Sequence, residues 1–427
     1  MERLAEPDAG LHSGQRDVRR ARVCRDLSPD ARWHAPRPLA VAERLDPREG
    51  EVAPFAVGRF PRRYLRWRSC RRGWIAEVHA PAMSVFRIGI DRGFLTEDGR
   101  LAWGDIGLGG LDGQPGIEIA YLPRVVDHLH PDQIKQYQAF VLGGTAVTRA
   151  SLASGASRLL AICRAGVGYD RVDVAALTEH DVALCTTPAA SKHAVASASF
   201  AYVLALGKQM AAKDRLVRAG RWDPASRGGH AGNEIQGKTL GIVGFGNTGS
   251  ELARLAAPFA MRVLASDPYA IADAARAASV TLVSLDDLFR ESDYVCIHAH
   301  LSAETRGLVT ERLLRLMKRT AYFINCARGP IVDEAALIRA LQEGWIAGAG
   351  LDVFEDEPLP LSSPLVAMEQ VMLSPHTMAH TLELSIAMGE INTAQILACA
   401  RGEAPGSVVN RAVLDRPGFQ AKLARWR

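Results

Sequence analysis

The segment from Thr239 to Gly249, which reads TLGIVGFGNTG, constrains the fold more than any other part of the chain. An apolar strand runs into a G-x-G-x-x-G turn, and residues 250–259 continue as a helix. Gly244 permits the tight turn, Gly246 allows a pyrophosphate to approach the backbone, and Gly249 lets the helix pack on the strand. The N-terminus of the helix adds N–H groups that bind anions. This unit predicts a doubly wound parallel α/β sheet that binds a dinucleotide.

The next apolar strand, residues 262–266, ends at Asp267, eighteen residues after the last glycine of the motif. A carboxylate at this position accepts a hydrogen bond from the adenosine 2′-hydroxyl and repels a 2′-phosphate, so the sequence favours NAD over NADP. We assign Asn247 and Thr248, in the glycine turn, to the same cofactor site. The structural alternative for Asp267 is an ordinary turn residue before Pro268.

Residues 1–82 differ in composition from the rest of the chain. They contain 17 arginines, no lysine and 11 acidic residues, a formal charge of +6, which leaves −2 of the total +4 for the remainder. They lack helical or strand periodicity, so we interpret them as a disordered, Arg-rich extension. They have no apolar segment for secretion and too many acids for a mitochondrial presequence. We expect the natural start at Met83; a regulatory basic arm is the alternative.

From Met83 onward, apolar strands alternate with amphipathic helices, the pattern of a parallel α/β sheet. A shorter unit extends to Pro188, and a longer unit follows it. The strands expected in the first unit are residues 117–121, 139–142 and 159–162. In the second unit we expect, after the glycine motif, strands at 294–298, 321–324 and 347–354 and helices at 311–318 and 334–343.

Charged side chains follow three strands of the second unit, where the sheet should bind its ligand: Arg328, Glu357 and His376. A guanidinium grips a carboxylate by paired hydrogen bonds, so Arg328 is assigned as the anchor of a 2-keto acid. A histidine can donate the proton that an alkoxide needs after hydride transfer, so His376 is the acid/base. Glu357 would orient that imidazole and stabilise its charged form. Taken singly, Arg328 could instead form a surface ion pair, Glu357 could be a solvated loop acid, and His376 could be a cap.

Composition disfavours several other functions. The remainder of the chain has no basic stripe interleaved with aromatic residues, which argues against nucleic-acid binding. No apolar run reaches the roughly eighteen residues that span a bilayer, so we expect no membrane association. Seven cysteines are scattered without a C-x-x-C pair or a zinc-type spacing. We therefore expect no metal site and a reducing, cytoplasmic compartment.

Taken together, these motifs resemble those of the D-2-hydroxyacid dehydrogenase family, which includes phosphoglycerate, hydroxypyruvate/glyoxylate and formate dehydrogenases. Residues 325–334, NCARGPIVDE, are similar to the arginine motif of the family, and residues 350–358, GLDVFEDEP, to its glutamate motif. Residues 374–376, SPH, resemble its histidine motif, and residues 163–173, CRAGVGYDRVD, its glycine-rich substrate loop. The resemblance covers most of residues 83–410.

The resemblance implies a Rossmann NAD-binding domain, residues 189–374, inserted in a flavodoxin-like substrate (catalytic) domain. That domain would comprise residues 83–188 completed by 375–411, and residues 412–427 would form a C-terminal tail. The implied activity is the interconversion of a D-2-hydroxy acid and its 2-keto acid with NAD. The implied assembly is a homodimer formed by the NAD-binding domains.

The resemblance also implies roles for single residues. Arg328, Glu357 and His376 would be catalytic. Asp352 would lie near the nicotinamide ring, and we assign Cys326 to the cofactor site as well. In the glycine-rich substrate loop, the backbone of Gly166, Val167 and Gly168 would receive the substrate carboxylate.

Three positions depart from the family pattern. His300 stands where the family usually has proline, His380 ends a segment that replaces a glycine-rich stretch, and Ser197 replaces a frequent glutamate. His300 and His380 are expected either to border the cleft and alter the pocket or to be solvated loop residues. The acyl side chain of the substrate is therefore left open.

A phosphorylated substrate would need extra cations near the pocket loop at residues 142–145. Three arginines are candidates only because they are close to this loop in the sequence: Arg149, Arg158 and Arg164. Two other functions fit the same motifs. One is an NAD-responsive binding module without significant turnover, and the other is a formate- or phosphite-type dehydrogenase on the same scaffold.

Overall fold

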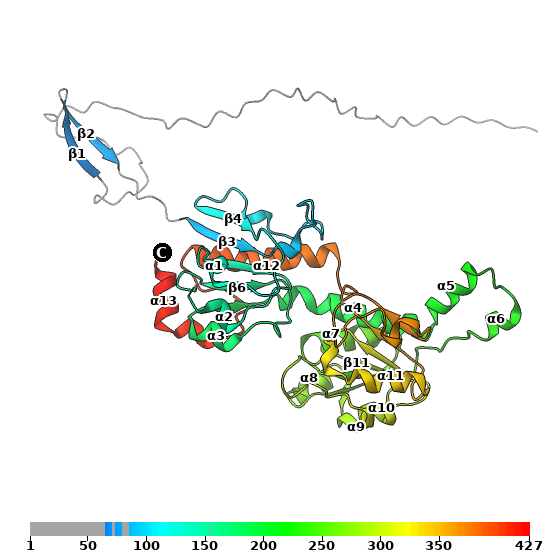
Figure 1. Ribbon diagram of the computed structural model, residues 1–427. Coiled ribbons are helices and arrows are strands. Elements are labelled where there is room, and N and C mark those ends of the chain that lie inside the picture. Colours follow the sequence, from blue (N-terminus) through cyan, green and yellow to red (C-terminus); the bar gives the residue numbers. More distant parts are fainter. Residues whose placement is uncertain (1–64, 71–72, 79–84, 155) are drawn as a thin grey trace, which may run out of the picture. The chain divides into compact units, whose positions relative to one another are not determined.

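The computed structural model of the protein describes residues 65–70, 73–78, 85–154 and 156–427 (Figure 1). The described residues belong to two units, residues 65–78 in the first and residues 85–427 in the second. In the first unit, strands β1 (Leu65–Cys70) and β2 (Gly73–Val78) pair antiparallel. This hairpin lies inside the segment for which the sequence predicts no regular structure. The other residues of that segment, and the expected start at Met83, lie outside the described residues.

The second unit contains a five-stranded parallel sheet with the order β4-β3-β5-β6-β7. Its strands are β3 (Phe86–Ile90), β4 (Ile117–Tyr121), β5 (Ala139–Leu142), β6 (Ala161–Arg164) and β7 (Ala183–Cys185). Counted along the chain, the order is 2-1-3-4-5, which is that of flavodoxin-like folds. This part of the predicted fold class is confirmed.

A seven-stranded parallel sheet follows, with the order β10-β9-β8-β11-β12-β13-β14. Its strands are β8 (Thr239–Val243), β9 (Arg262–Ser266), β10 (Val280–Leu282), β11 (Tyr294–Ile297), β12 (Tyr322–Asn325), β13 (Gly348–Leu351) and β14 (Val371–Leu373). The first six follow the Rossmann order 3-2-1-4-5-6, and β14 extends that sheet by one strand. The predicted Rossmann sheet is therefore confirmed.

Along the chain the helices alternate with the strands, and in space they cover the two sheets (Figure 1). Near the five-stranded sheet they are α1 (Pro131–Ile134), α2 (Arg149–Leu152) and α3 (Val174–Glu179). Near the seven-stranded sheet they are α7 (Asn247–Ala256), α8 (Ala272–Ala277), α9 (Leu285–Glu291), α10 (Glu311–Leu316) and α11 (Glu334–Gln342). Short 3-10 turns occur at Arg92–Phe94, Gly109–Leu111, Ala257–Phe259, Gly329–Ile331, Pro364–Ala367 and Arg411–Asp415. None of the helices in the described part of the chain is long and apolar enough to cross a membrane.

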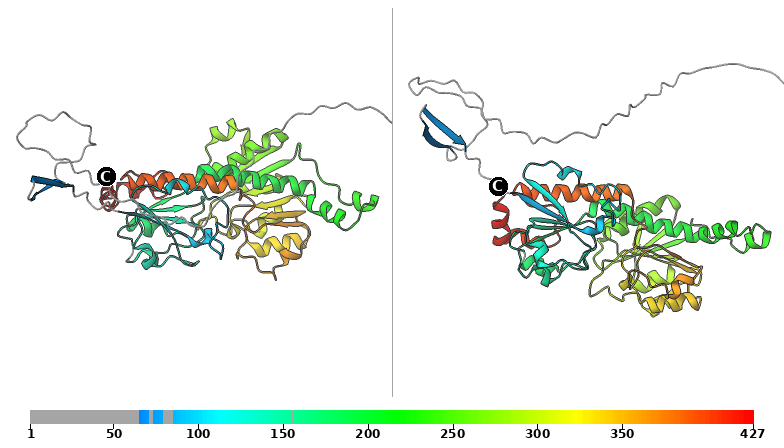
Figure 2. Two further views of the ribbon diagram at one scale, coloured as in Figure 1. Left: turned by 90° about the horizontal axis from the view of Figure 1, so that it is seen from above. Right: turned by 45° about the horizontal axis from the view of Figure 1, so that its top comes forward.

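Two long helices connect the sheets. Helix α4 (Pro188–Gly207) leads from the first sheet to the second, and α12 (Leu382–Ala400) leads back. They contact each other, and Figure 2 shows α12, in orange, alongside α4, in green. The predicted boundary 188/189 lies at the start of α4, and the predicted boundary 374/375 lies in the loop between β14 and α12. Helices α5 (Met210–Arg218) and α6 (Pro224–Gly228) follow α4 and project from the seven-stranded sheet (Figure 1).

Both sheets are covered on both faces, which explains why their strands are continuous apolar runs in the sequence. Strands β5 and β11 are buried at every residue. Four clusters of buried side chains form the cores. Because the sheets are covered in this way, polar groups can reach ligands only at the ends of the strands, where the connecting loops lie.

The C-terminal residues differ from the predicted tail. Residues 417–424 form helix α13, and its Phe419 and Leu423 are buried in the core of the five-stranded sheet. The ammonium group of Lys422 donates hydrogen bonds to four backbone carbonyls at 2.7–3.1 Å. Only two apolar positions in this short segment face the core, which is too weak a periodicity to identify from the sequence.

Candidate active site

The glycine turn after β8 has the geometry that its sequence predicts. Gly244 has a φ of 92°, and a Cβ atom there would lie 2.6 Å from the backbone nitrogen of Ala299. A Cβ atom at Gly249 would lie 2.2 Å from the carbonyl oxygen of Gly244, so the helix packs directly on the turn. Gly246 instead faces open space. The backbone at this position is free to approach a ligand, as a dinucleotide requires.

The predicted ribose-binding acid lies beside this turn. The Asp267 carboxylate accepts hydrogen bonds from the N–H groups of Phe245 at 2.7 Å and Tyr269 at 2.8 Å. It therefore joins the turns that follow β8 and β9, at the carboxyl edge of the sheet. Asn247 and Thr248 form the first turn of α7, where N–H groups are free to bind anions. Together these residues fit the phosphate and ribose groups of NAD.

His376 and Glu357 form a hydrogen-bonded pair. The Nδ1 atom of His376 lies 2.8 Å from Oε2 of Glu357, and Oε1 of Glu357 accepts the N–H of Phe354 at 3.1 Å. Burial raises the pKa of Glu357. This effect is outweighed by the hydrogen bond to His376, the charge of His376, the Phe354 N–H and the charge of Arg328, so the pKa of Glu357 lies below its ordinary value. The carboxylate is thus kept ionised. His376 has a φ of 56°, a left-handed conformation uncommon outside glycine.

Arg328 lies across the glycine-rich loop. Its Nε atom donates to Asp170 at 2.8 Å, and its Nη1 atom donates to the carbonyl of Ala327 at 2.7 Å. A Cβ atom at Gly168 would lie 1.4 Å from Nη2 of Arg328, so only glycine leaves room for the guanidinium. Burial raises the pKa of Asp170, but the charge and hydrogen bond of Arg328 lower it overall. The sequence analysis did not assign Asp170, although it is part of the substrate-loop motif.

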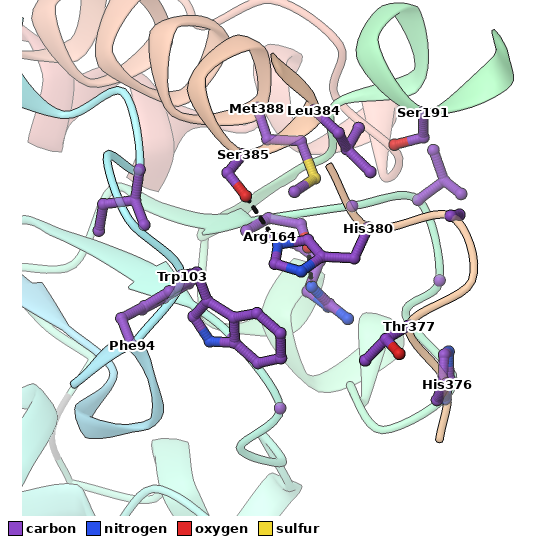
Figure 3. Close-up of a pocket in the computed structure, with 18 of the residues that line it drawn as sticks. Phe94, Trp103, Arg164, Ser191, His376, Thr377, His380, Leu384, Ser385 and Met388 are labelled. Atoms are coloured by element: carbon purple, nitrogen blue, oxygen red, sulfur yellow. Dashed lines mark hydrogen bonds between the residues drawn. The ribbon is translucent and has the colours of Figure 1, made fainter. Parts of the chain in front are cut away.

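Arg328, His376 and the glycine-rich loop meet at one cavity of about 350 Å³, between the carboxyl ends of the strands and α12 (Figure 3). The predicted site residues that line it are Gly166, Val167, Gly168, Cys326, Arg328, Asp352 and His376. Glu357 is outside the lining and lies behind His376. The residues of the glycine turn and Asp267 are not part of this cavity either, so the structure separates a reaction site from a site for the remainder of the dinucleotide.

Asp352 and Cys326 are both largely buried at the ends of adjacent strands. The Oδ1 atom of Asp352 accepts the N–H groups of Thr377 at 2.9 Å and Met378 at 3.0 Å. Asp352 therefore fixes the loop that follows His376. Burial raises the pKa of Cys326 to about 12, so this thiol remains protonated near neutral pH.

The residues that depart from the family pattern have different surroundings. His380 lines the cavity, where its Nε2 atom lies 2.7 Å from Oγ of Ser385 and its ring packs edge-on against Trp103 (Figure 3). Burial lowers the pKa of His380. His300 packs against the ring of Tyr169 outside the cavity lining. Ser197 is exposed and donates to a backbone carbonyl within its own helix.

Of the three arginines indicated by proximity, only Arg164 lines the cavity. Burial, and then the charge of Arg328, lower its pKa to about 10. It donates to the carbonyl of Ala165, and no carboxylate forms an ion pair with it among the described residues. Arg149 pairs with Glu179 on the surface, and Arg158 lines a different hollow. No group of three metal-ligating side chains occurs in residues 85–154 and 156–427.

The sequence analysis missed the walls of the cavity. Phe94 and Trp103 come from loops after β3, and Leu384 and Met388 come from α12. Apolar side chains of this kind are indistinguishable in the sequence from core residues, and only their convergence on one space identifies them.

Comparisons with known proteins agree with this geometry. A family model described as the NAD-binding domain of D-isomer specific 2-hydroxyacid dehydrogenases matches residues 200–378. A glyoxylate reductase from Korarchaeum cryptofilum is 39% identical over 292 residues, which cover 68% of this chain and 88% of that protein. A glyoxylate reductase from Aeropyrum pernix is 39% identical over 274 residues, which cover 63% and 82%.

Solved structures give the same result. The crystal structure of a glyoxylate reductase from Paecilomyes thermophila has a TM-score of 0.65 at 27% identity, and the match covers 77% of this chain and 100% of that one. An NAD-dependent formate dehydrogenase from Staphylococcus aureus has a TM-score of 0.60 at 26% identity, with 71% and 92% covered. The chain belongs to the D-isomer-specific 2-hydroxyacid dehydrogenase family and is an NAD-dependent oxidoreductase.

Proposed function

We propose that this protein reduces a 2-keto acid to the D-2-hydroxy acid, with His376 as general acid, Glu357 as its partner and Arg328 as substrate anchor. The observation that carries this proposal is the 2.8 Å pair of His376 and Glu357 beside the cavity that Arg328 lines. NAD, when bound in its reduced form, supplies the hydride. The reverse oxidation uses the same groups, with His376 as base.

The substrate carboxylate would bind at the glycine-rich loop. Arg328 has two of its donor atoms engaged by Asp170 and Ala327, which leaves Nη2 to bind a ligand. Arg164 adds a second guanidinium to the same cavity, and we assign it to the same anion. The backbone at Gly166 and Gly168 lets a carboxylate approach closely, because neither residue has a side chain.

His376 would protonate the carbonyl oxygen as negative charge develops on it. For this step the imidazolium must face the substrate with Nε2, because Nδ1 is held by Glu357. The ionised carboxylate of Glu357 stabilises the charged ring and fixes its orientation. Asp352 contributes indirectly by holding the backbone of the loop after His376.

The cofactor would lie along the carboxyl edge of the seven-stranded sheet. We assign the pyrophosphate to Gly246 and the first turn of α7, and the adenosine ribose to Asp267. Cys326 and Asp352 would border the nicotinamide end. Because many curated relatives are glyoxylate reductases, small 2-keto acids are the first substrates to test.

We also propose a homodimer that works in a reducing, cytoplasmic compartment. Helix α5 and the segment after it expose Met210, Val217 and Trp222, which a monomer would leave in water. A hollow beside helix α5 is lined in part by Arg215 and Met372. Five cysteines of residues 85–427 are buried free thiols, which suits a reducing environment: Cys163, Cys185, Cys296, Cys326 and Cys399. Sedimentation of the purified protein at low and high concentration tests the dimer.

The test of the activity is the consumption of NADH by the purified full chain with a panel of 2-keto acids. We expect turnover that falls by about 10²–10⁴-fold in His376→Ala, since general acid catalysis contributes on that scale. Glu357→Gln should lower kcat with little change in KM, because it keeps the shape of the side chain but removes its charge. Leu361→Ala is the matched control, since Leu361 is 90% exposed and away from the cavity.

NADH binding without turnover on any acid would contradict the proposed reaction and favour an NAD-responsive binding module. Turnover that persists in His376→Ala would contradict the role of the histidine alone. Oxidation of formate with no reduction of any 2-keto acid would assign a different reaction to the same cavity.

A further inference from the structure

The cavity extends along α12 beyond the groups assigned to the reaction. Five residues of this helix line it: Leu384, Ser385, Met388, Gly389 and Asn392. They form two adjacent pairs and a single residue, and each pair is followed four residues later by the next, so all five lie on one face of the helix. The distance from the first to the last is eight residues, or about 12 Å at 1.5 Å per residue. A two-carbon acid held at Arg328 leaves most of this length empty.

Aromatic side chains form another wall of the cavity. In Figure 3, Trp103 and Phe94 lie on the side away from Leu384 and Met388. The ring of Trp103 meets the ring of His380 edge-on, with centroids 4.2 Å apart and an interplanar angle of 84°. Trp103 remains 38% exposed, so a large part of the indole surface is available to a ligand. An exposed aromatic face inside a cavity favours flat or branched apolar groups.

This wall is fixed in place by contact between backbones. A Cβ atom at Gly107 would lie 2.0 Å from the carbonyl oxygen of Ile386, and one at Gly389 would lie 1.7 Å from that of Ile106. The loop after Trp103 therefore packs on α12 with no intervening side chain. The space between them is preformed and does not depend on a ligand to open it.

The cofactor does not account for this wall. The residues assigned to the nicotinamide end, Cys326 and Asp352, follow strands of the seven-stranded sheet. Phe94 and Trp103 belong to the loops that follow β3 in the five-stranded sheet. His380 does not introduce a fixed positive charge here, because burial lowers its pKa and favours the neutral ring.

Asn392 gives the cavity a second, independent feature. It is fully buried, and neither its amide oxygen nor its amide nitrogen has a hydrogen-bond partner among the described residues. A buried amide without partners is unfavourable, so a ligand with a hydrogen-bonding group would be selected at this point.

We propose that the substrate is a 2-keto acid with a bulky, mainly apolar side chain, bound between Trp103 and Met388, with a hydrogen-bonding group that reaches Asn392. This inference rests on the proposed function, since the keto acid itself is held by Arg328 and His376. An arylpyruvate with a ring hydroxyl has this chemistry. Glyoxylate lacks both the apolar group and the distal polar group.

The test compares kcat/KM for glyoxylate, pyruvate, 4-methyl-2-oxopentanoate, phenylpyruvate and 4-hydroxyphenylpyruvate with NADH and the full chain. We expect an increase of about tenfold or more from glyoxylate to the arylpyruvates, since apolar pockets discriminate on that scale. Glyoxylate as the best substrate would overturn this inference and leave the proposed function intact. No turnover on any acid would overturn the proposed function itself.

A pocket-filling variant tests the position of the side chain. Met388→Trp should lower kcat/KM for phenylpyruvate by about tenfold or more while that for glyoxylate changes by less than about threefold. Glu383→Trp is the matched control, because Glu383 is an exposed residue of the same helix outside the cavity. Equal losses for both substrates would overturn the proposal. If Met388→Trp does not fold, Leu384→Phe provides the same comparison.

Asn392→Leu tests the polar contact. It should remove a preference for 4-hydroxyphenylpyruvate over phenylpyruvate without lowering kcat/KM for phenylpyruvate. A parent protein that uses the two arylpyruvates equally, or a preference that survives in Asn392→Leu, would overturn the assignment of Asn392.

Discussion

Gly168 shows how one small residue sets the position of a charged one. A Cβ atom there would lie 1.4 Å from Nη2 of Arg328. We therefore predict that Gly168→Ala displaces the guanidinium and lowers kcat/KM for 2-keto acids by about 10²-fold, because misplacement by about 1 Å has effects of that size. Steady-state kinetics measure the loss. Gly109→Ala is the control, since a Cβ atom at Gly109 meets no atom within 4 Å and the residue lies outside the cavity lining.

We predict that one residue, Asp267, also decides the choice between NAD and NADP. Asp267 lies beside the glycine turn through its bond to the N–H of Phe245. Asp267→Asn keeps an acceptor for that N–H but removes the negative charge, so NADPH should be used better and NADH worse. We expect the ratio of kcat/KM for the two cofactors to change by roughly tenfold or more, since hydrogen bonds to charged groups contribute about 1.5–3 kcal/mol. An unchanged ratio, with unchanged KM for the keto acid, would exclude Asp267 as the determinant.

At the scale of elements, α13 completes a core rather than forming a tail. Phe419 is fully buried, and Leu423 lies in the same cluster. We predict that Phe419→Ala lowers the free energy of unfolding by about 3–5 kcal/mol, the usual cost of a large cavity. Denaturant unfolding measures the change, and kcat per folded molecule should stay the same. Arg425→Ala, at an exposed neighbour, should change stability by less than about 0.5 kcal/mol.

The elements that the sequence predicts best are those with strong local signals. The strands expected at residues 117–121 and 139–142 match β4 and β5 in full. The strand expected at 159–162 is observed two residues later, as β6. The helix after the glycine motif begins at Asn247 rather than Ser250, because the turn itself supplies the first helical residues. Boundaries move in this way since tertiary contacts decide where an element ends.

At the scale of the whole molecule, a buried histidine makes stability depend on pH. The Nε2 atom of His298 is buried and has no hydrogen-bond partner in the part of the chain that the structure describes, and burial lowers the pKa of His298 from 6.5 to about 4. Between these values the unfolded chain binds a proton that the folded protein does not, so stability falls as the pH drops through this window. The loss is at most about 3 kcal/mol, and less because part of the residue remains accessible.

Urea unfolding at about pH 7 and about pH 5 measures this loss. The other ionisable groups contribute equally to the parent protein and to a variant, so their effect cancels when the two proteins are compared. His298→Leu should reduce the difference between the two pH values by about 1–3 kcal/mol. His128→Leu, at an exposed histidine, should leave the difference as in the parent protein. A parent protein whose stability is the same at both values would contradict the prediction.

The sequence by itself determined the fold class and the cofactor, and it predicted the reacting groups. The glycine motif, the strand-helix alternation and the polar residues at strand ends are local patterns, and sheet geometry brings such strand ends together. Arg328, Glu357 and His376 were accessible to this reasoning because each follows a strand of the same sheet. Asp170 was not, because its partner Arg328 is 158 residues away in the chain.

Only the tertiary structure decided the shape of the cavity and the packing of the C-terminal helix α13. Trp103 lies on a loop after β3, whereas Met388 and Asn392 lie on α12, and nothing in the local sequence of either segment shows that they line the same cavity. The burial of Phe419 likewise depends on a surface formed by distant strands. A local pattern specifies which face of an element is apolar, but the packing of distant elements decides whether that face meets a core or a ligand.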